Sequence, residues 1–271
     1  QGWKTMVAEL KRQKPSIKIG LVGKYVELHD AYLSVREALN HAALFYGVDV
    51  DLQWISSTDI EKNIGKDLLV GLNGIIVPGG FGSRGVEGKV IAAQYARENQ
   101  VPYLGICLGL QVMMIDFAQN VLGLKEADSA EFDKLTPDPV IDLMLEQRGL
   151  DKLGGTMRLG LYPCHIKPET KASVLYQTEE IYERHRHRYE FNNDYRQKFE
   201  ENGIVFSGLS PDGVLVEMAE LKDHPFMMAS QFHPEFLSRP NRAHPLFLGF
   251  IAAACKNAGF SDQLVDLDFT N

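Results

Sequence analysis

The sequence is short of three things: cysteine, long apolar runs and positive charge. Its 271 residues include three cysteines, which cannot all pair and whose spacing fits no disulfide framework. We therefore expect a reducing compartment and place the protein in the cytoplasm. No apolar run approaches the roughly 20 residues that span a bilayer, and Gln1–Pro15 has no apolar core of the signal-peptide type. The formal net charge of −8 argues against a protein that coats nucleic acid or anionic membranes.

Motifs that cradle phosphates are missing as well. Neither G-x-x-x-x-G-K-[ST] nor G-x-G-x-x-G occurs, and Lys24 after Gly23 is not followed by Ser or Thr. We find no internal repeat and no low-complexity tract. What remains is typical of a globular protein, with 45% hydrophobic and 24% charged residues. The length suits one large domain or two small ones.

Hydrophobic patterning in the first half predicts alternating strands and helices. The predicted strands are Ile17–Gly23, Val48–Ile55, Gly74–Gly80 and Val101–Ile106. The predicted helices run from Asp30, as N-cap, to Tyr46, and over Val86–Glu98 and Leu108–Val121. This order predicts a parallel sheet with helices on both faces. Ligands of such folds bind at the carboxyl ends of the strands.

The pattern changes after Gly123. Lys125–Lys152 is polar and is predicted to be an insertion, and the segment after it is predicted to mix strands with two short helices. The elements expected there are the helices Thr178–Arg184 and Asp194–Asn202, the buried strand Phe226–Phe232 and the closing helix Ala243–Ala258. Gln1–Pro15 is predicted to form a short amphipathic linker helix that leads into one domain over residues 16–271.

The turn Gly105-Ile106-Cys107-Leu108-Gly109 carries the clearest chemical signal. It joins an apolar strand to a helix and matches the G-x-nucleophile-x-G elbow, with Cys in place of Ser. A sharp turn of this kind strains the backbone of the nucleophile and needs neighbours without Cβ atoms. The helix N-terminus favours a thiolate and offers N–H groups to an oxyanion. Cys107 is therefore the predicted nucleophile, with a small buried core residue as the alternative.

A cysteine nucleophile needs a base, and the base needs an orienting group. His233 and Glu235 follow a buried strand and are two residues apart, and Pro234 is expected to keep the link between them extended. The alternative is a surface His beside a solvated Glu. The predicted oxyanion donors are the N–H groups of Leu108 and of Gly80 in the loop Gly79–Gly82.

These three motifs together resemble the class I glutamine amidotransferases: a Pro-Gly-Gly loop, the G-x-C-x-G elbow and a late His-Pro-Glu. The resemblance implies a flavodoxin-like α/β fold, with an open, mostly parallel sheet and a smaller antiparallel or mixed extension. It implies hydrolysis of L-glutamine through a glutamyl thioester. Cys107 would be the nucleophile, His233 the base and acid, and Glu235 the orienting residue.

Four further segments resemble the glutaminase half of the CTP synthase family. They are GKYVELHDAYLSVREALNHA from Gly23, PVIDLM from Pro139, GGTMRLG from Gly154 and RHRHRYEFNN from Arg184. The resemblance implies that glutamine contacts Gly80, Phe81, Leu108, Gly109, Leu110, Gln111, Glu131 and Arg188. Carboxylate and guanidinium suit the ammonium and carboxylate of an amino acid. The alternatives are a solvated charge for Glu131, and a basic solvated strand or an acid-binding patch for Arg184–Arg188.

No metal site is predicted, because the arginines between His185 and His187 would repel a cation and a third ligand is not evident. Cys164 and Cys255 are predicted to be structural. The resemblance also implies a partner, an ATP-dependent synthetase domain that precedes the glutaminase in the same polypeptide and aminates UTP. ATP, Mg²⁺ and allosteric GTP are expected only in that full-length enzyme, which would be a homotetramer, and no cofactor is expected in this domain. Gln1–Pro15 would be what remains of the linker, and a first residue other than Met fits a part of a longer chain.

Two other functions stay open at this point. One is a γ-glutamyl hydrolase or peptidase-like relative that uses the same triad on a larger substrate. The other is a regulatory module with an inert site.

Overall fold

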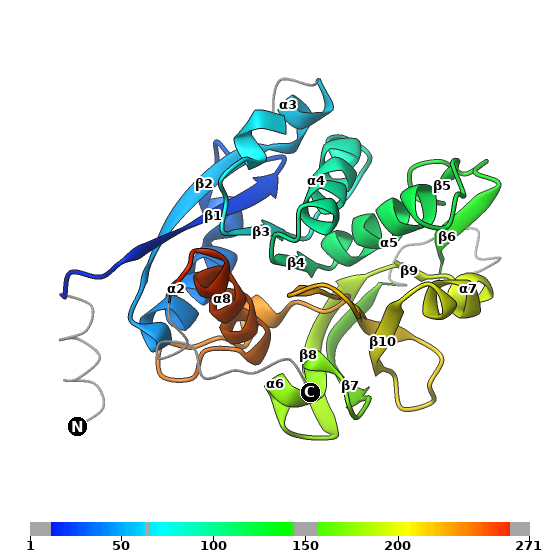
Figure 1. Cartoon of the computed structure of the whole chain (residues 1–271). Helices are drawn as coiled ribbons and strands as arrows, with labels where there is room; N and C mark the ends of the chain where they lie inside the picture. The colour runs from blue at the N-terminus through cyan, green and yellow to red at the C-terminus, as the bar shows by residue number, and fades with distance from the viewer. Residues whose placement is uncertain (1–11, 63–65, 144–156, 261–271) are drawn as a thin grey trace.

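A nine-stranded sheet organises the chain in the computed structural model, which describes residues 12–62, 66–143 and 157–260 (Figure 1). The strand order is β2-β1-β3-β4-β12-β11-β10-β7-β8. Five neighbouring strands are parallel: β1 (Ser16–Gly23), β2 (Asp49–Ser56), β3 (Gly74–Val77), β4 (Tyr103–Ile106) and β12 (Met227–Ser230). Four antiparallel strands follow: β11 (Val216–Leu221), β10 (Ile204–Leu209), β7 (Arg158–Ile166) and β8 (Glu180–His187).

Helices cover both faces of the parallel half of this sheet, as the alternating pattern predicts. One face carries α2 (Leu33–Tyr46) and α8 (Pro245–Asn257), and the other carries α3 (Ser57–Glu61), α4 (Val86–Glu98) and α5 (Leu108–Asn120) (Figure 1). Each face has its own apolar core, because β3 and β4 are buried on both sides and alternate their side chains between the two. The α/β class is confirmed. The strands from the first half of the chain are parallel as predicted, and four antiparallel strands continue the same sheet.

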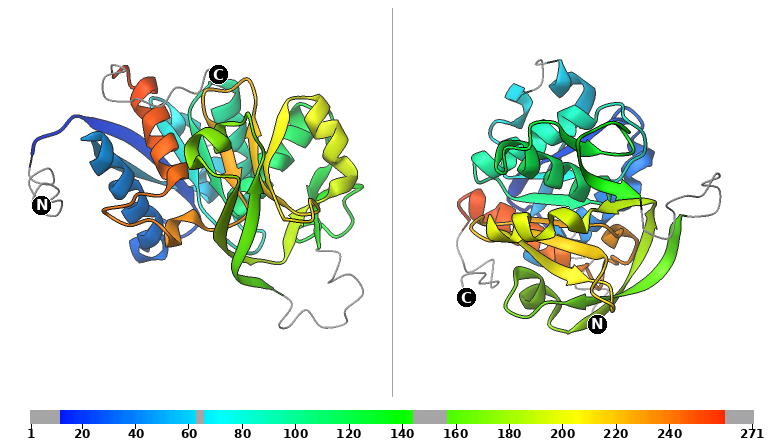
Figure 2. Two further views of the ribbon diagram at one scale, coloured as in Figure 1. Left: turned by 90° about the horizontal axis from the view of Figure 1, so that it is seen from below. Right: turned by 90° about the vertical axis from the view of Figure 1, so that its right-hand side faces the viewer.

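A second, three-stranded sheet extends this fold. It consists of β5 (Ala127–Ser129), β6 (Asp138–Leu143) and β9 (Tyr189–Phe191), with one parallel and one antiparallel pairing. Two short helices, α6 (Lys171–Tyr176) and α7 (Arg196–Glu201), belong to the part of the chain that forms the antiparallel strands. Figure 2 shows the parallel strands β1 and β2 and the antiparallel strands β7, β8 and β10 at opposite ends of the molecule. The mixed extension that the resemblance implies is therefore present.

Two local predictions were wrong. The predicted helix Thr178–Arg184 is mostly strand β8, because Ile181, Glu183, His185 and His187 alternate into the interior with a period of two. Asp30 does not cap α2; it lies in the 3-10 turn η1 (His29–Tyr32), and Tyr32 occupies the N-cap. The polar segment that begins at Lys125, predicted to be an insertion, contains β5 and β6.

Two predictions concern residues that the structure describes only in part. The proposed linker helix over Gln1–Pro15 lies mostly outside the described residues, and so does the end of the polar segment after Leu143. Among the helices that are described, none combines the length and apolar character needed to cross a membrane.

Candidate active site

Cys107 lies at the strand-to-helix turn between β4 and α5, with its backbone in a conformation that L-residues rarely adopt. Its φ is 53° and its ψ is −102°, and its N–H donates to the carbonyl oxygen of Ser230 at 2.7 Å. Strain of this kind persists only where the surroundings fix it, and it is frequent at functional sites. The thiol sits directly before the first residue of α5, where the helix dipole favours a thiolate.

The two glycines of the elbow are needed for close packing. A Cβ atom on Gly109 would lie 2.2 Å from the carbonyl oxygen of Val77, the last residue of β3. A Cβ atom on Gly105 would lie 2.6 Å from the backbone of Gly109. The helix α5 can therefore start this close to two strands only if both positions lack a side chain.

His233 and Glu235 meet beside Cys107. The Nδ1 atom of His233 is 2.8 Å from Oε1 of Glu235, and both residues are largely buried. Burial alone lowers the pKa of His233, but the neighbouring Cys107 and Glu235 outweigh burial and raise this pKa to about 10. An imidazolium beside the sulfur is therefore the favoured state at neutral pH. The link differs from the expected extended form: Pro234 begins the 3-10 turn η5 (Pro234–Phe236), which still brings the two side chains together.

The loop after β3 packs directly against this pair. A Cβ atom on Gly79 would lie 2.9 Å from Cε1 of His233 and 3.5 Å from Cβ of Cys107, so only glycine leaves room for the imidazole. The N–H groups of Gly80 and Leu108 make no hydrogen bond within the described residues. Both belong to segments that adjoin Cys107, which is the arrangement needed for oxyanion donors.

Two lysines hold this loop, and sequence reasoning missed both roles. Lys89 on α4 is 1% exposed, and its Nζ donates to the carbonyl oxygen of Pro78 at 3.3 Å. Lys24 Nζ donates to the carbonyl oxygen of Phe81. Burial, together with the charge of Lys24, lowers the pKa of Lys89 to about 7, although Cys107 opposes this shift. The sequence offered no signal for Lys89, because a helical lysine ordinarily faces solvent.

A small pocket joins most of the residues predicted to bind glutamine. It is lined by Gly80, Phe81, Cys107, Gln111, Glu131, His187, Arg188 and Tyr189. Glu131 accepts a hydrogen bond from the N–H of Gly82 at 3.2 Å, which ties it to the loop. The Nε atom of Arg188 is buried without a hydrogen-bond partner in the described part of the chain. Both charges thus reach the same pocket from different elements.

The residues Leu108, Gly109 and Leu110 lie at the start of α5 but do not line this pocket. Leu108 and Leu110 are buried in the apolar core beneath the helix. Any contact that these residues make with a ligand would involve their backbone, and their predicted role in glutamine binding stays a prediction.

The other two cysteines are placed as structural residues. Cys164 on β7 and Cys255 on α8 are fully buried, and burial raises the pKa of both thiols, that of Cys255 to about 11. Across the described ranges, no group of three or more His, Cys, Asp or Glu side chains could hold a metal ion.

An α/β sheet with a cysteine elbow, a His–Glu pair and a glycine loop defines the class, and comparison with known proteins agrees. The family described as "Glutamine amidotransferase class-I" matches residues 27–253. The chain therefore belongs to the class I glutamine amidotransferases.

Within that class, the chain is similar over nearly all its length to CTP synthases. The CTP synthase of Bacillus subtilis is 59% identical over 256 residues, which cover 94% of this chain and 48% of that protein. The CTP synthase of Chloroflexus aggregans is 56% identical over 266 residues, which cover 97% of this chain and 49% of that protein. The chain thus spans about half the length of the curated relatives it matches.

A solved structure places the similarity in one domain of those proteins. The Trypanosoma brucei CTPS glutaminase domain with bound acivicin superposes with a TM-score of 0.84 at 37% identity, and the match covers 89% of this chain and 94% of that one. Over nearly its whole length the chain is thus similar to the glutaminase domain of a CTP synthase.

Proposed function

We propose that the chain hydrolyses L-glutamine to glutamate and ammonia, with Cys107 as nucleophile, His233 as acid and base, and Glu235 as the orienting residue. The observation that carries this proposal is the meeting of a strained cysteine with a buried His–Glu pair at 2.8 Å beside the glycine loop. The pocket next to the sulfur offers Glu131 to an ammonium group and Arg188 to a carboxylate, which together suit a free amino acid.

The first half-reaction begins from the thiolate–imidazolium pair. The sulfur of Cys107 attacks the side-chain carboxamide carbon of glutamine, and the N–H groups of Gly80 and Leu108 stabilise the oxyanion. His233 then gives its proton to the nitrogen as the C–N bond breaks. Ammonia leaves, and the products on the enzyme are a γ-glutamyl thioester and a neutral imidazole.

The second half-reaction returns the site to its starting state. Neutral His233 takes a proton from water, whose oxygen attacks the thioester carbonyl. Collapse of the tetrahedral intermediate breaks the C–S bond and releases glutamate, leaving the thiolate and the imidazolium. Glu235 keeps Nδ1 of His233 in its hydrogen bond throughout, so that Nε2 is the atom that exchanges the proton.

The relatives support a wider role. We propose that the ammonia serves a synthetase domain in the same polypeptide, which forms CTP from UTP and ATP. The support for this step is that the matched relatives are named CTP synthase and are about twice as long as the chain. ATP, Mg²⁺, GTP and a tetrameric assembly are proposed for that full-length protein, with no cofactor bound by this domain.

Ammonia release from glutamine tests the proposal, measured for this chain with and without an added synthetase domain and GTP. Cys107→Ala should abolish the activity, whereas the matched variant Cys255→Ala, at a buried site on α8, should keep it. Acivicin, which is bound in the similar Trypanosoma brucei domain, should protect Cys107 from alkylation. Substantial ammonia release by Cys107→Ala would refute the assignment.

A further inference from the structure

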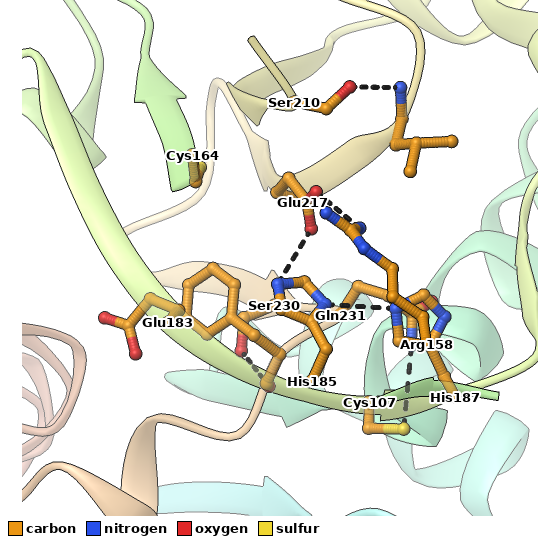
Figure 3. Close-up of polar contacts among 12 residues, drawn as sticks. Cys107, Arg158, Cys164, Glu183, His185, His187, Ser210, Glu217, Ser230 and Gln231 are labelled. Atoms are coloured by element: carbon orange, nitrogen blue, oxygen red, sulfur yellow. Dashed lines mark hydrogen bonds and ion pairs between the residues drawn. The ribbon is translucent and has the colours of Figure 1, made fainter. Parts of the chain in front are cut away.

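The sulfur of Cys107 has two polar neighbours besides His233: the carbonyl oxygen of Arg186, at 3.9 Å, and a side-chain amide. Gln231, the residue directly after β12, is fully buried, and its Nε2 atom donates to Sγ of Cys107 at 3.6 Å (Figure 3). Its backbone N–H donates to the carbonyl oxygen of Glu217 at 2.8 Å, which fixes where the side chain begins. A side-chain amide in this position approaches the reacting atom itself.

Gln111 fixes the orientation of that amide. Its Nε2 atom donates both to Oε1 of Gln231 at 3.3 Å and to the carbonyl oxygen of Tyr189 at 3.1 Å. Because Oε1 of Gln231 is occupied by a donor, its NH₂ group is the end left to face Cys107. Gln111 also lines the glutamine pocket, so it touches both the pocket and this contact.

Two buried histidines are hydrogen-bonded to each other, and one of them contacts the same carbonyl oxygen of Tyr189. Nδ1 of His187 is 3.1 Å from the oxygen of Tyr189, which can only accept, so Nδ1 carries the proton. Nε2 of His187 must then accept from Nδ1–H of His185, 3.0 Å away. This fixes the tautomers of both rings. Burial lowers the pKa of His185 to about 2 and that of His187 to about 3, which keeps them uncharged.

This series of contacts ends at the buried carboxyl group of Glu217. Nε2 of His185 is left as an acceptor and lies 3.4 Å from Oε2 of Glu217. Neither atom has a hydrogen-bond partner among the described residues, and a proton on the carboxyl group would join the two. Burial raises the pKa of Glu217 to about 7 against the effect of Arg158, whose Nη1 bonds Oε1 at 2.6 Å. Figure 3 shows the dashed contacts between Arg158 and Glu217, between Glu217 and His185, and between Gln231 and Cys107.

We propose that Gln231 is a further catalytic residue, whose amide donates a hydrogen bond to the thiolate of Cys107, and that Gln111, His187, His185 and Glu217 are positioning residues that hold this amide in one orientation. The inference rests on the proposed function, since it assigns a partner to the same nucleophile. The N–H of Gln231 stabilises the sulfur whenever it carries negative charge, before attack and again when the C–S bond of the thioester breaks.

The test is the pH dependence of alkylation at Cys107, followed by mass spectrometry with iodoacetamide as the probe on the intact chain without substrate. Gln231→Met keeps the length of the side chain but removes the donor. It should raise the midpoint pH of alkylation by about 1 unit, as expected when a hydrogen bond to a charged group is lost. It should also lower kcat for ammonia release about tenfold. Gln197→Met removes an exposed amide that bonds Glu201 at 2.7 Å and is the matched control, with no change expected.

Three further variants test the positioning residues, and they keep the inference testable if Gln231→Met fails to fold. Gln111→Met should move the midpoint in the same direction by about half as much, because the donor remains but turns freely. Glu217→Leu should do likewise, and Glu217→Gln, which keeps a donor toward His185, should restore the midpoint. Unchanged midpoints in folded Gln231→Met and Gln111→Met would overturn the inference. If the unaltered chain released no ammonia from glutamine, that result would count against the proposed function instead. The alkylation test would still stand, because it needs no substrate.

Discussion

Replacing Gly109 by alanine should separate the geometry of the elbow from the stability of the fold. The new Cβ atom would lie 2.2 Å from the carbonyl oxygen of Val77, more than 1 Å inside ordinary contact, and neither backbone can yield alone. Overpacking of this kind costs about 1–3 kcal/mol. For a chain of this size a loss of about 2 kcal/mol lowers the melting temperature by about 4–8 °C.

The displacement should act on catalysis more strongly than on stability. Moving α5 away from β3 moves Cys107 relative to the loop that begins at Pro78 and carries Gly80. A misplacement of about 1 Å can cost about 100-fold in rate. We therefore expect kcat for glutamine hydrolysis to fall about 100-fold in Gly109→Ala, measured as ammonia release at saturating glutamine.

Gly123→Ala is the matched control for this experiment. Gly123 has a φ of 74°, and no atom lies within 4 Å of the place that a Cβ atom would occupy, so alanine there strains the backbone without a clash. It should cost about 1–2 kcal/mol and leave kcat unchanged. A Gly109→Ala protein with the melting temperature and kcat of the unaltered chain would refute the packing argument.

Three further changes test the site. Glu131→Gln removes a charge from the pocket and should raise KM for glutamine about tenfold with little change in kcat, which steady-state kinetics will show; an unchanged KM would contradict its proposed contact with the ammonium group. Glu235→Gln should lower the pKa of His233, which titration followed by NMR can measure, and reduce kcat at least about 100-fold; an unshifted His233 would contradict the coupling. Lys89→Met removes the donor to Pro78 and should lower kcat about tenfold. The folded-state pKa of Lys89 is lowered to about 7, so below pH 7 the buried ammonium destabilises the fold by its full amount. Between pH 7 and pH 10.5 the buried amine is neutral and this destabilisation fades. The unfolding free energy of the unaltered chain, measured by denaturant titration, should therefore rise relative to that of Lys89→Met over this range.

The parallel half of the fold could be predicted because its local signals agree with one another. Short apolar runs such as β1 and β4, bounded by Gly or Pro, favour a strand, and Gly47 ends α2 in the left-handed conformation that glycine adopts without strain. The antiparallel half was harder. Glu180–His187 carries charged or polar side chains on both faces of the strand, so its alternation did not stand out until the fold buried Glu183, His185 and His187 and left Arg184 and Arg186 exposed.

The candidate site divides in the same way. Cys107, His233 and Glu235 could be found because each stands in a short motif with a local physical reason, and the structure brings all three together. Lys89, by contrast, looks like an ordinary helical lysine. It is buried because the fold places α4 against the loop after β3, where its Nζ atom reaches the carbonyl oxygen of Pro78.

The local sequence was enough to predict the alternation of strands and helices, the elbow at Cys107 and the later His-Pro-Glu motif, because backbone propensity and glycine placement act over a few residues. Which side chains surround the sulfur depended on tertiary structure. Gln231 lies next to Cys107 because β12 pairs with β4, and the chain from Gln111 to Glu217 forms because β8 and β11 bury their polar side chains toward the same interior. Contacts between segments this far apart in the sequence depend on the pairing of whole strands, and no local pattern encodes that pairing.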